Sequence, residues 1–369
     1  MITRRTLGRR LLAAGSGLAL PGMLSLSHPA QAAGNNPPWL MPDEAAKHKR
    51  TWMAFGASRT IWGSSLLPKV RANLGLIAST IAEFEPVTLL ARPNELGLAR
   101  QYCGSEVQLL SAALDDIWMR DSGCVFVKNP QGQAAGLDFG FNGWGGKQAC
   151  AQDKKVAALS SAAAGALAIK AGIIMEGGAI EVDGQGTAIL TESCILNSNR
   201  NPGMSKATAE AKLMPLLGLK KIIWLPGIKG RDITDAHTDF YARFVRPGVV
   251  VAHYDSDPYS YDNAVTKKHL NLLRAAQDAQ GRVLDVIQLT APTQTRAGRN
   301  NPDFAAGYVN FYLVNGGLIL PEFGDARADA IARSTLQDLL PQHEIVQLNI
   351  DAIAAGGGGI HCVTQQEPA

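Results

Sequence analysis

An amphipathic helical pattern that leads into a short apolar run recurs along this chain of 369 residues. Because helices and strands must bury their apolar faces against one another, this alternation leaves few possible architectures and predicts the α/β class. The apolar runs are of the kind found in buried strands. The expected pairs are Lys69–Phe84 with Val87–Ala91, Ser205–Leu217 with Lys221–Leu225, Asp262–Gln280 with Val283–Leu289, and Asp325–Leu339 with Glu344–Leu348.

Local signals support these boundaries. Ser205 stands where a helix N-cap is expected, and Gly218 stands where that helix should stop. The run Asn315-Gly316-Gly317 separates the apolar segments Tyr308–Leu313 and Leu318–Pro321, which predicts a β-hairpin.

Two common α/β folds lose their support. Neither Gly-x-Gly-x-x-Gly after the first strand nor a Gly-x-x-x-x-Gly-Lys-Ser/Thr loop occurs, so the sequence offers no dinucleotide or P-loop site. Similar helix–strand units without a visible sequence repeat fit a propeller-like ring, and they equally fit an irregular doubly wound sheet. No Pro/Ser-rich linker divides residues 34–369, and we predict a single domain there.

The first 33 residues have the layout of a secretory signal peptide. The basic region contains Arg4 and Arg5, an arginine pair typical of twin-arginine signals, which export folded proteins. An apolar stretch follows, interrupted by Pro21 and too short for a spanning helix, and Ala30-Gln31-Ala32 resembles a cleavage site. We expect a mature protein that is periplasmic or secreted and not membrane-bound.

The charge distribution narrows the class of partner. The formal net charge is +3, but the first 33 residues carry four arginines and no acid, so residues 34–369 carry −1 (+3 minus 4). A nucleic-acid binder needs a basic face on its folded body, so no nucleic-acid partner is expected. Five cysteines without a Cys-x-x-Cys pair indicate neither a complete disulfide framework nor a zinc site.

Reactive side chains gather in segments that adjoin apolar runs or glycine-rich turns, where binding sites tend to form. In the segment nearest the C-terminus, Gly356–Cys362, a run of glycines leads into Cys362, within the strand-like Ile360–Val363. An arbitrary cysteine is most often a small buried hydrophobe, but this setting, with a histidine elsewhere, favours a nucleophile. The segments are Asp115–Gly123, Met175–Gly178, Asp232–Asp239 and Gly356–Cys362.

His237 and Asp239 are separated by one residue, so on an extended segment both side chains would point to one face. This spacing suits a proton-transfer group beside a charge partner, although a purely structural His–Asp pair is also open. A metal site is disfavoured, because hard carboxylates such as Glu176 or Asp121 with one thiolate make an incoherent ligand set. We predict no metal and no cofactor.

The acids Asp121, Glu176 and Asp239 exceed what a cysteine protease-type site requires. Buried carboxylates are tolerable only when they are paired, so several of them around a thiol indicate a cationic substrate. A planar guanidinium fits best, since carboxylates can bind its N–H groups bidentately. The residues therefore predict thiol-dependent hydrolysis of a guanidine C–N bond.

Collinear segments of residues 41–369 resemble the agmatine deiminases, within a broader family that includes bacterial peptidyl-arginine deiminases. The likeness begins near Met41-Pro42-Asp43-Glu44. It continues through Trp118-Met119-Arg120-Asp121-Ser122-Gly123, Glu176-Gly177-Gly178, Asp183-Gly184-Gln185-Gly186-Thr187, Asn199-Arg200-Asn201-Pro202, Thr234-Asp235-Ala236-His237-Thr238-Asp239, Tyr308-Val309-Asn310-Phe311-Tyr312 and Gly357-Gly358-Gly359-Ile360-His361-Cys362-Val363-Thr364-Gln365-Gln366.

The resemblance implies a pentein fold, a five-bladed α/β propeller with pseudo-fivefold symmetry and an axial active site. It implies that Cys362 attacks the guanidinium carbon and forms a covalent amidino-thioether, while His237 is the general acid that protonates the departing ammonia and then the base that activates water. Asp121 and Asp239 would bind the guanidinium, and Glu176 would orient or charge-stabilise the histidine. The resemblance further places Trp118 and Asn310 near the substrate.

Three positions depart from the family pattern. Ala236 replaces the usual Gly before the histidine, Gly359 the usual Asn before Ile-His-Cys, and Cys124 a common Pro. We expect Gly359 to loosen the nucleophile turn and Ala236 to alter the pocket rim. Reaction type is thus better specified than substrate.

The implied reaction converts agmatine to N-carbamoylputrescine and ammonia, a step of putrescine and polyamine biosynthesis. No Arg lies between Arg120 and Arg200, where peptidyl enzymes place residues that meet a substrate carboxylate, and this favours agmatine. Export favours a peptide-modifying enzyme instead, so a peptidyl-arginine or free-arginine deiminase that forms citrulline is the alternative. A non-catalytic agmatine- or polyamine-binding protein is the rival class, and homo-oligomerisation is left open.

Overall fold

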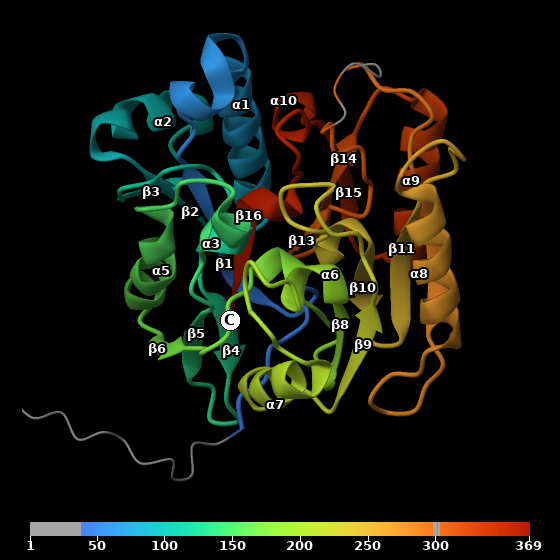
Figure 1. Cartoon of the computed structure of the whole chain (residues 1–369). Coiled ribbons are helices and arrows are strands. Elements are labelled where there is room, and N and C mark those ends of the chain that lie inside the picture. Colours follow the sequence, from blue (N-terminus) through green and yellow to red (C-terminus); the bar gives the residue numbers. More distant parts are fainter. Residues whose placement is uncertain (1–37, 298–300, 302) are drawn as a thin grey trace, which may run out of the picture. The chain divides into compact units, whose positions relative to one another are not determined.

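The computed structural model describes residues 38–297, 301 and 303–369, which belong to the unit Pro37–Ala369 (Figure 1). The predicted signal peptide and its export route lie outside the described residues. Within those residues, no helix has both the length and the apolar character needed to cross a membrane.

In the described ranges the strands form five small sheets, with the orders β4-β5-β6, β7-β8-β9, β10-β11-β12, β13-β14-β15 and β16-β1-β2-β3. The strands are β1 (His48–Phe55), β2 (Val87–Ala91), β3 (Gln108–Ser111), β4 (Val125–Lys128), β5 (Ala134–Asp138), β6 (Leu167–Lys170), β7 (Glu181–Val182), β8 (Thr187–Thr191), β9 (Lys221–Leu225), β10 (Ala242–Arg246), β11 (Val249–Tyr254), β12 (Asp285–Thr290), β13 (Tyr312–Val314), β14 (Gly317–Glu322), β15 (Glu344–Asn349) and β16 (Thr364–Pro368).

Each sheet repeats one connection: an antiparallel strand pair, then a helix that leads to a third, parallel strand. The α/β class is thereby confirmed, and five separate sheets exclude a single doubly wound one. The crossover helices are α1 (Arg59–Ala82), α5 (Val156–Ala164), α7 (Lys206–Leu217), α8 (Asn263–Ala275) and α9 (Ala326–Leu339). The shorter helices are α2 (Leu96–Cys103), α3 (Met119–Ser122), α4 (Gly143–Gly146), α6 (Glu192–Ile195) and α10 (Asp351–Ala354).

Local chemistry sets several of these boundaries. Ser205 Oγ accepts the Thr208 N–H at 3.1 Å and caps α7, which ends at the left-handed Gly218, as predicted. The helix α8 is shorter than predicted: it ends at Ala275, because the Asp278 carboxylate accepts two backbone N–H groups beyond the helix and turns the chain into β12.

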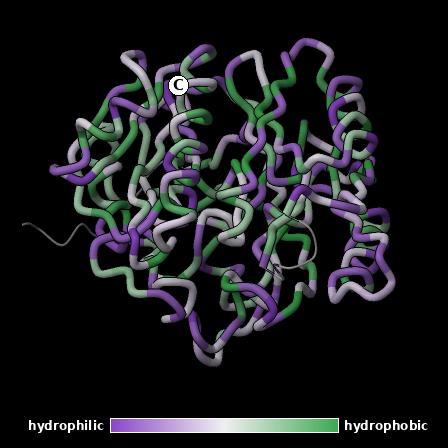
Figure 2. Tube along the Cα trace, turned by 90° about the horizontal axis from the view of Figure 1, so that it is seen from above, coloured by the Kyte–Doolittle hydropathy of each residue, from purple (hydrophilic) through white to green (hydrophobic). Residues whose placement is uncertain are grey.

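The core is divided among apolar clusters beneath the sheets. The largest joins α1 and the first and last sheets, and it contains the fully buried Phe55, Leu74, Phe311 and Ile319. Figure 2 shows the hydrophobic stretches running mainly through the interior and the hydrophilic ones mainly at the periphery. In Figure 1, α5 and α8 lie at opposite sides of the molecule with the sheets between them.

A short buried turn precedes the first strand of each sheet, and these turns meet one another. They are α3 before β4, the 3₁₀ turn Gly177–Ala179 before β7, Thr238–Phe240 before β10, the loop 307–310 before β13, and His361–Val363 before β16. Asp121 Oδ1 accepts the Gly178 N–H at 3.1 Å, and Asn310 Nδ2 donates to Asp239 O at 3.3 Å. One turn from every sheet thus contributes to a common centre, as expected of an α/β propeller.

Candidate active site

The turn that carries Cys362 is a 3₁₀ turn, and β16 begins only at Thr364. The predicted strand at Ile360–Val363 is therefore wrong: the Ile360 carbonyl accepts the Val363 N–H at 3.3 Å, which bends the backbone into a turn. This bend presents the thiol toward the centre where the five turns meet instead of into a sheet face.

The glycines before this turn act in different ways. Gly357 has φ +86° and therefore uses the left-handed region, whereas Gly358 and Gly359 do not. A Cβ on Gly358 would overlap the Trp118 ring, and one on Gly359 would overlap the Asn310 side chain. Gly359 thus permits close packing, contrary to the expectation that it loosens the turn.

Asn310 and Trp118, both predicted near the substrate, form the wall around the nucleophile. Asn310 Nδ2 lies 3.4 Å from Cys362 Sγ, and its Oδ1 accepts the His361 N–H at 3.1 Å. Trp118 is held by Asp116, whose carboxylate accepts its indole N–H at 2.9 Å. Asn310 thus contacts the thiol directly, while Trp118 packs against Gly358 in the turn before it.

Cys362 is almost fully buried, and its thiol lies 3.8 Å from Asp239 Oδ2. Burial, followed by the negative charges of Asp239 and Asp121, raises the pKa of the Cys362 thiol well above its ordinary value. The thiol is therefore protonated in the free protein, and a cation placed beside the two carboxylates would favour the thiolate.

The two oxygens of the Asp239 carboxylate differ in their hydrogen bonding. Its Oδ2 lies 2.7 Å from His361 Nδ1, whereas its buried Oδ1 has no hydrogen-bond partner within the described part of the chain. An unpaired buried carboxylate oxygen is costly unless a donor arrives. Burial would raise the pKa of Asp239, but His361 and then His237 hold this pKa below its ordinary value. The Asp239 carboxylate is therefore charged.

Asp121 faces the same centre from α3. Its Oδ1 accepts the Gly178 N–H at 3.1 Å and its Oδ2 accepts the Trp144 indole N–H at 2.9 Å. Burial, with the nearby Glu176 and Asp239, raises the pKa of Asp121 to about 6, against the opposing effect of His237. Asp121 is thus ionised at neutral pH and protonated in mild acid.

Gly178 brings the reactive groups together. A Cβ there would lie 2.5 Å from His237 Nδ1, 3.0 Å from Asp121 Oδ1 and 3.1 Å from Asp239 Oδ2. The predicted same-face geometry on an extended strand is wrong, because Thr238–Phe240 is a 3₁₀ turn. The three side chains converge because the glycine leaves room for them.

His237 is paired with Glu176, as the sequence led us to expect. Its Nε2 lies 3.1 Å from Glu176 Oε2, and its Nδ1 lies 3.7 Å from Asp121 Oδ1. Burial would lower the pKa of His237, but Asp121, Cys194 and Glu176 raise it well above its ordinary value. The imidazole is therefore protonated at rest and can act as an acid.

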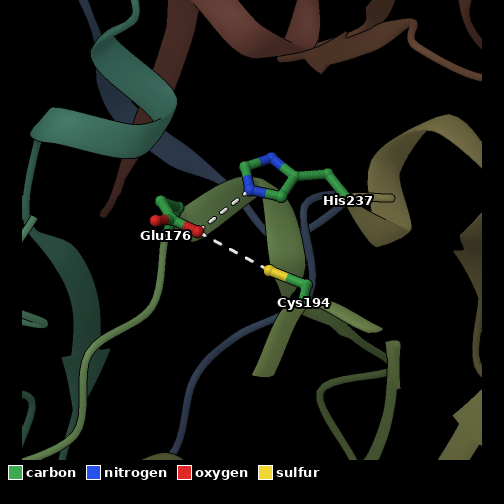
Figure 3. A group of neighbouring side chains, drawn as sticks. All are labelled: Glu176, Cys194 and His237. Atoms are coloured by element: carbon green, nitrogen blue, oxygen red, sulfur yellow. Dashed lines mark hydrogen bonds and ion pairs between the residues drawn. The ribbon is translucent and has the colours of Figure 1, made fainter. Parts of the chain in front are cut away.

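Sequence reasoning missed two groups behind this pair, Arg200 and Cys194, and Figure 3 shows Cys194 with the pair. Arg200 Nε lies 2.9 Å from both oxygens of Glu176, and its guanidinium also binds Asp235 at 2.8 Å. Cys194, on α6, lies with its Sγ 3.6 Å from Glu176 Oε2. Burial and Glu176 raise the pKa of this second thiol. Arg200 belongs to Asn199-Arg200-Asn201-Pro202, one of the segments that resemble the family, so the sequence did offer a signal for it.

A second ionic group, which we call the Glu44 network, lies behind Cys362. Glu44 accepts from Arg243 at 2.6 Å and lies 3.3 Å from Arg120 and 2.8 Å from His361 Nε2. Arg243 also binds Glu181 at 2.7 Å. Against the effect of burial, Arg243 and His361 hold the pKa of Glu44 well below its ordinary value. This network holds the imidazole ring of His361, the residue that precedes the nucleophile Cys362.

The other two departures from the family pattern, Ala236 and Cys124, lie at the edge of the site and away from it. Ala236 and Asp235 both have left-handed backbone, with φ +71° and +61°, immediately before His237. A Gly would adopt this conformation without strain, which accounts for the usual family residue. Cys124 is buried next to Ser160, 3.3 Å from its Oγ, in the sheet core behind the site.

The fold and this cluster of side chains define a class of protein. The family model of the Porphyromonas-type peptidyl-arginine deiminases matches residues 40–368. The chain belongs to this family. Among its relatives, the agmatine deiminase of Pseudomonas fluorescens is 37% identical over 352 residues, which cover 89% of this chain and 95% of the relative. A Streptomyces coelicolor protein described as a candidate agmatine deiminase is 40% identical over 336 residues, with 89% and 98% covered.

Solved structures agree with these relatives. The agmatine deiminase of Enterococcus faecalis superposes with a TM-score of 0.83 at 30% identity, covering 90% of this chain and 96% of that one. A C. jejuni agmatine deiminase, in a cysteine-to-serine variant with substrate bound, gives a TM-score of 0.79 at 26% identity, again over 90% and 96%.

Proposed function

We propose that this protein is an agmatine deiminase, which hydrolyses agmatine to N-carbamoylputrescine and ammonia. The observation that carries the proposal is the buried Asp239 carboxylate, whose Oδ1 has no hydrogen-bond partner in the described part of the chain and whose Oδ2 lies 3.8 Å from the Cys362 thiol. A Cβ on Gly178 would lie 3.1 Å from this Oδ2 and 3.0 Å from Asp121 Oδ1, so the two carboxylates approach the same point. Two carboxylates around a protonated thiol form a site that only a cation completes. A guanidinium supplies both the positive charge and N–H donors in a planar fork.

The reaction follows from the charges of the site. Guanidinium bound between Asp121 and Asp239 offsets their effect on Cys362, whose thiol proton leaves to solvent. The thiolate forms a C–S bond to the guanidinium carbon. His237 gives its Nδ1 proton to a departing nitrogen, the C–N bond breaks and ammonia leaves, so that an amidino-thioether remains.

Hydrolysis then reverses the role of the imidazole. Neutral His237 takes a proton from water, and the resulting hydroxide attacks the amidino carbon. The C–S bond breaks, the thiolate leaves and the hydroxyl proton is lost, which gives the ureido product. Glu176, held by Arg200, faces Nε2 throughout and stabilises the imidazolium form.

The arginines around the site favour agmatine over arginine. Arg200 is bound to Glu176 and Asp235, while Arg120 and Arg243 are bound in the Glu44 network. Each is committed to a carboxylate of the protein, and none of the three is placed to receive the carboxylate of an arginine or an arginyl peptide. Agmatine carries an amine in its place.

The test uses the purified protein without residues 1–33, with ammonia release measured from agmatine, free arginine and an arginyl peptide at equal concentration. We expect turnover of agmatine to exceed that of the others by at least about tenfold, a difference of roughly 1.4 kcal/mol. Faster turnover of the peptide would identify a peptidyl-arginine deiminase. Binding of agmatine without ammonia release would identify a binding protein.

We also propose that residues 1–33 export the protein by the twin-arginine route, on the sequence pattern described above. Replacing Arg4 and Arg5 together by Lys should retain the protein in the cytoplasm, as measured by fractionation. Arg9→Lys is the matched control and should be exported normally. Export of the double variant would contradict the route.

A further inference from the structure

We infer that Glu176, Cys194 and His237 form an inhibitory site for a borderline-soft divalent cation such as Zn²⁺. Figure 3 shows the three side chains pointing toward one another from different elements. Among the described residues, they are the group whose possible ligand atoms lie within 4.8 Å of one another, and all three are buried. This set contains Cys194 and is distinct from the nucleophile.

The geometry is close to that of a zinc site. Glu176 Oε2 lies 3.1 Å from His237 Nε2 and 3.6 Å from Cys194 Sγ. Zinc bonds of about 2.0 Å to N or O and about 2.3 Å to S place tetrahedral ligand atoms roughly 3.3 to 3.6 Å apart. Small side-chain movements therefore suffice, and the fourth position stays open.

The donor set selects the metal. One imidazole nitrogen, one thiolate and one carboxylate suit Zn²⁺ or Co²⁺, whereas Mg²⁺ and Ca²⁺ prefer oxygen ligands only. Sequence reasoning disfavoured a metal because it considered only Cys362 as the sulfur ligand. Cys194 changes this conclusion, since its thiol approaches the carboxylate that already holds the histidine.

The surroundings support the ligands. Arg200 fixes the Glu176 carboxylate, and Asp121 faces the second ring nitrogen of His237 at 3.7 Å, as carboxylates beside metal-bound histidines do. The cluster keeps an excess of one negative charge even with His237 protonated, because four carboxylates face three cations. These are Asp121, Glu176, Asp235 and Asp239 against His237, Arg200 and Lys147.

Binding is a balanced exchange. Zn²⁺ replaces the proton on His237 Nε2 and the thiol proton of Cys194, and both protons go to solvent, so the net charge of the cluster is unchanged. With the metal on Nε2, the ring could release its Nδ1 proton only as an imidazolate. It could not alternate between acid and base, and hydrolysis stops although Cys362 is untouched.

The first test titrates Zn²⁺ against ammonia release from agmatine, each variant being normalised to its own zinc-free rate. We expect the Zn²⁺ concentration for half-inhibition to rise at least about tenfold in Cys194→Ala relative to wild type. Cys124→Ala, which removes another buried thiol, is the matched control and should keep wild-type sensitivity. Equal sensitivity of Cys194→Ala and wild type, or no inhibition of wild type, would overturn the inference.

The second test needs no turnover, so it stands even if agmatine is not the substrate. Co²⁺ added to Cys362→Ala protein should give a thiolate-to-metal absorption band, and the Cys362→Ala/Cys194→Ala double variant should lose it. Absence of the band in Cys362→Ala would place the metal on the nucleophile and overturn the inference. Should Cys194→Ala unfold in a thermal melt, Cys194→Ser replaces it in both tests, with the same expected losses.

Discussion

Two buried histidines flank the guanidinium position, and they differ in what surrounds them. His237 faces the carboxylates of Glu176 and Asp121, which raise its pKa well above the ordinary value against the effect of burial. His361 also touches two carboxylates, but burial and the guanidinium groups of Arg120 and Arg243 lower its pKa. Nearby charge, and not depth, makes one ring an acid and the other a neutral support.

The largest effect on turnover should come from removing the thiol of Cys362, near which both histidines lie. Cys362→Ala removes the only proposed nucleophile, so ammonia release from agmatine should fall to the uncatalysed rate. Agmatine should still bind, as measured by calorimetry, because Asp121 and Asp239 are intact and lose a competing thiol. Unchanged turnover would refute covalent catalysis.

His237→Asn tests the acidic member of the pair. Loss of general acid–base catalysis should lower kcat by about 10³-fold, with little change in agmatine affinity. Quenched mass spectrometry should find either no adduct or an amidino adduct on Cys362 that persists. Turnover like that of wild type would remove His237 from proton transfer.

His361→Ala tests the neutral member, whose Nδ1 positions Asp239. We expect kcat/KM to fall by about 10 to 100-fold, mainly through KM, because the Asp239 carboxylate loses one of its supports. His361→Asn, whose amide nitrogen can take the place of Nδ1 beside Asp239, should recover part of the loss. A loss as large as that of His237→Asn, confined to kcat, would show that the two histidines do not differ as described.

The pH dependence of kcat/KM should report the ionisation of Asp121, whose Oδ1 lies 3.7 Å from His237 Nδ1. Asp121, with its pKa raised to about 6, must be ionised to bind a guanidinium, so kcat/KM should rise as pH increases through about 6 and then level off. Below that pH it should fall about tenfold per pH unit. Asp121→Asn should remove this acidic limb along with most activity, and a limb that persists in the variant would belong to another group.

The smallest effect concerns the backbone before Cys362. Gly357→Ala adds a Cβ that would make only an ordinary van der Waals contact, 3.7 Å from Asp303 O, but it forces a φ of +86° on an L-residue. The free energy of unfolding should fall by about 1 kcal/mol, as measured in urea, with activity within about twofold of wild type. Gly358→Ala, which meets the Trp118 ring, is the contrasting variant and should lose activity.

Sequence reasoning identified Cys362, His237 and the three acids because each sits next to a local signal, such as a glycine run or a strand. Helix α7 was bounded correctly for the same reason, since its caps are local. The contact of His361 with Glu44 joins residues 317 positions apart, and no local pattern encodes it. The convergence at Gly178 likewise depends on how the sheets pack against one another.

The same holds for Cys194, which sits in an ordinary short helix after a strand. Its relevance arises only from the distance to Glu176, a residue in a different turn. The two errors of local structure, at Ile360–Val363 and at Thr238–Phe240, have one cause. Each segment directly precedes a strand, β10 at Ala242 or β16 at Thr364, and contacts between the sheets bend the chain there in a way that the local sequence does not reveal.

The pairing of β16 with β1, seen in Figure 1 as a red strand beside a blue one, has a consequence for biogenesis. The strand next to Cys362 pairs with residues 48–53, so the first sheet is completed only when the last strand leaves the ribosome. A nascent chain can assemble the other sheets earlier, as domains fold during synthesis. Until then its reactive thiol has no site, and the nascent chain cannot consume agmatine.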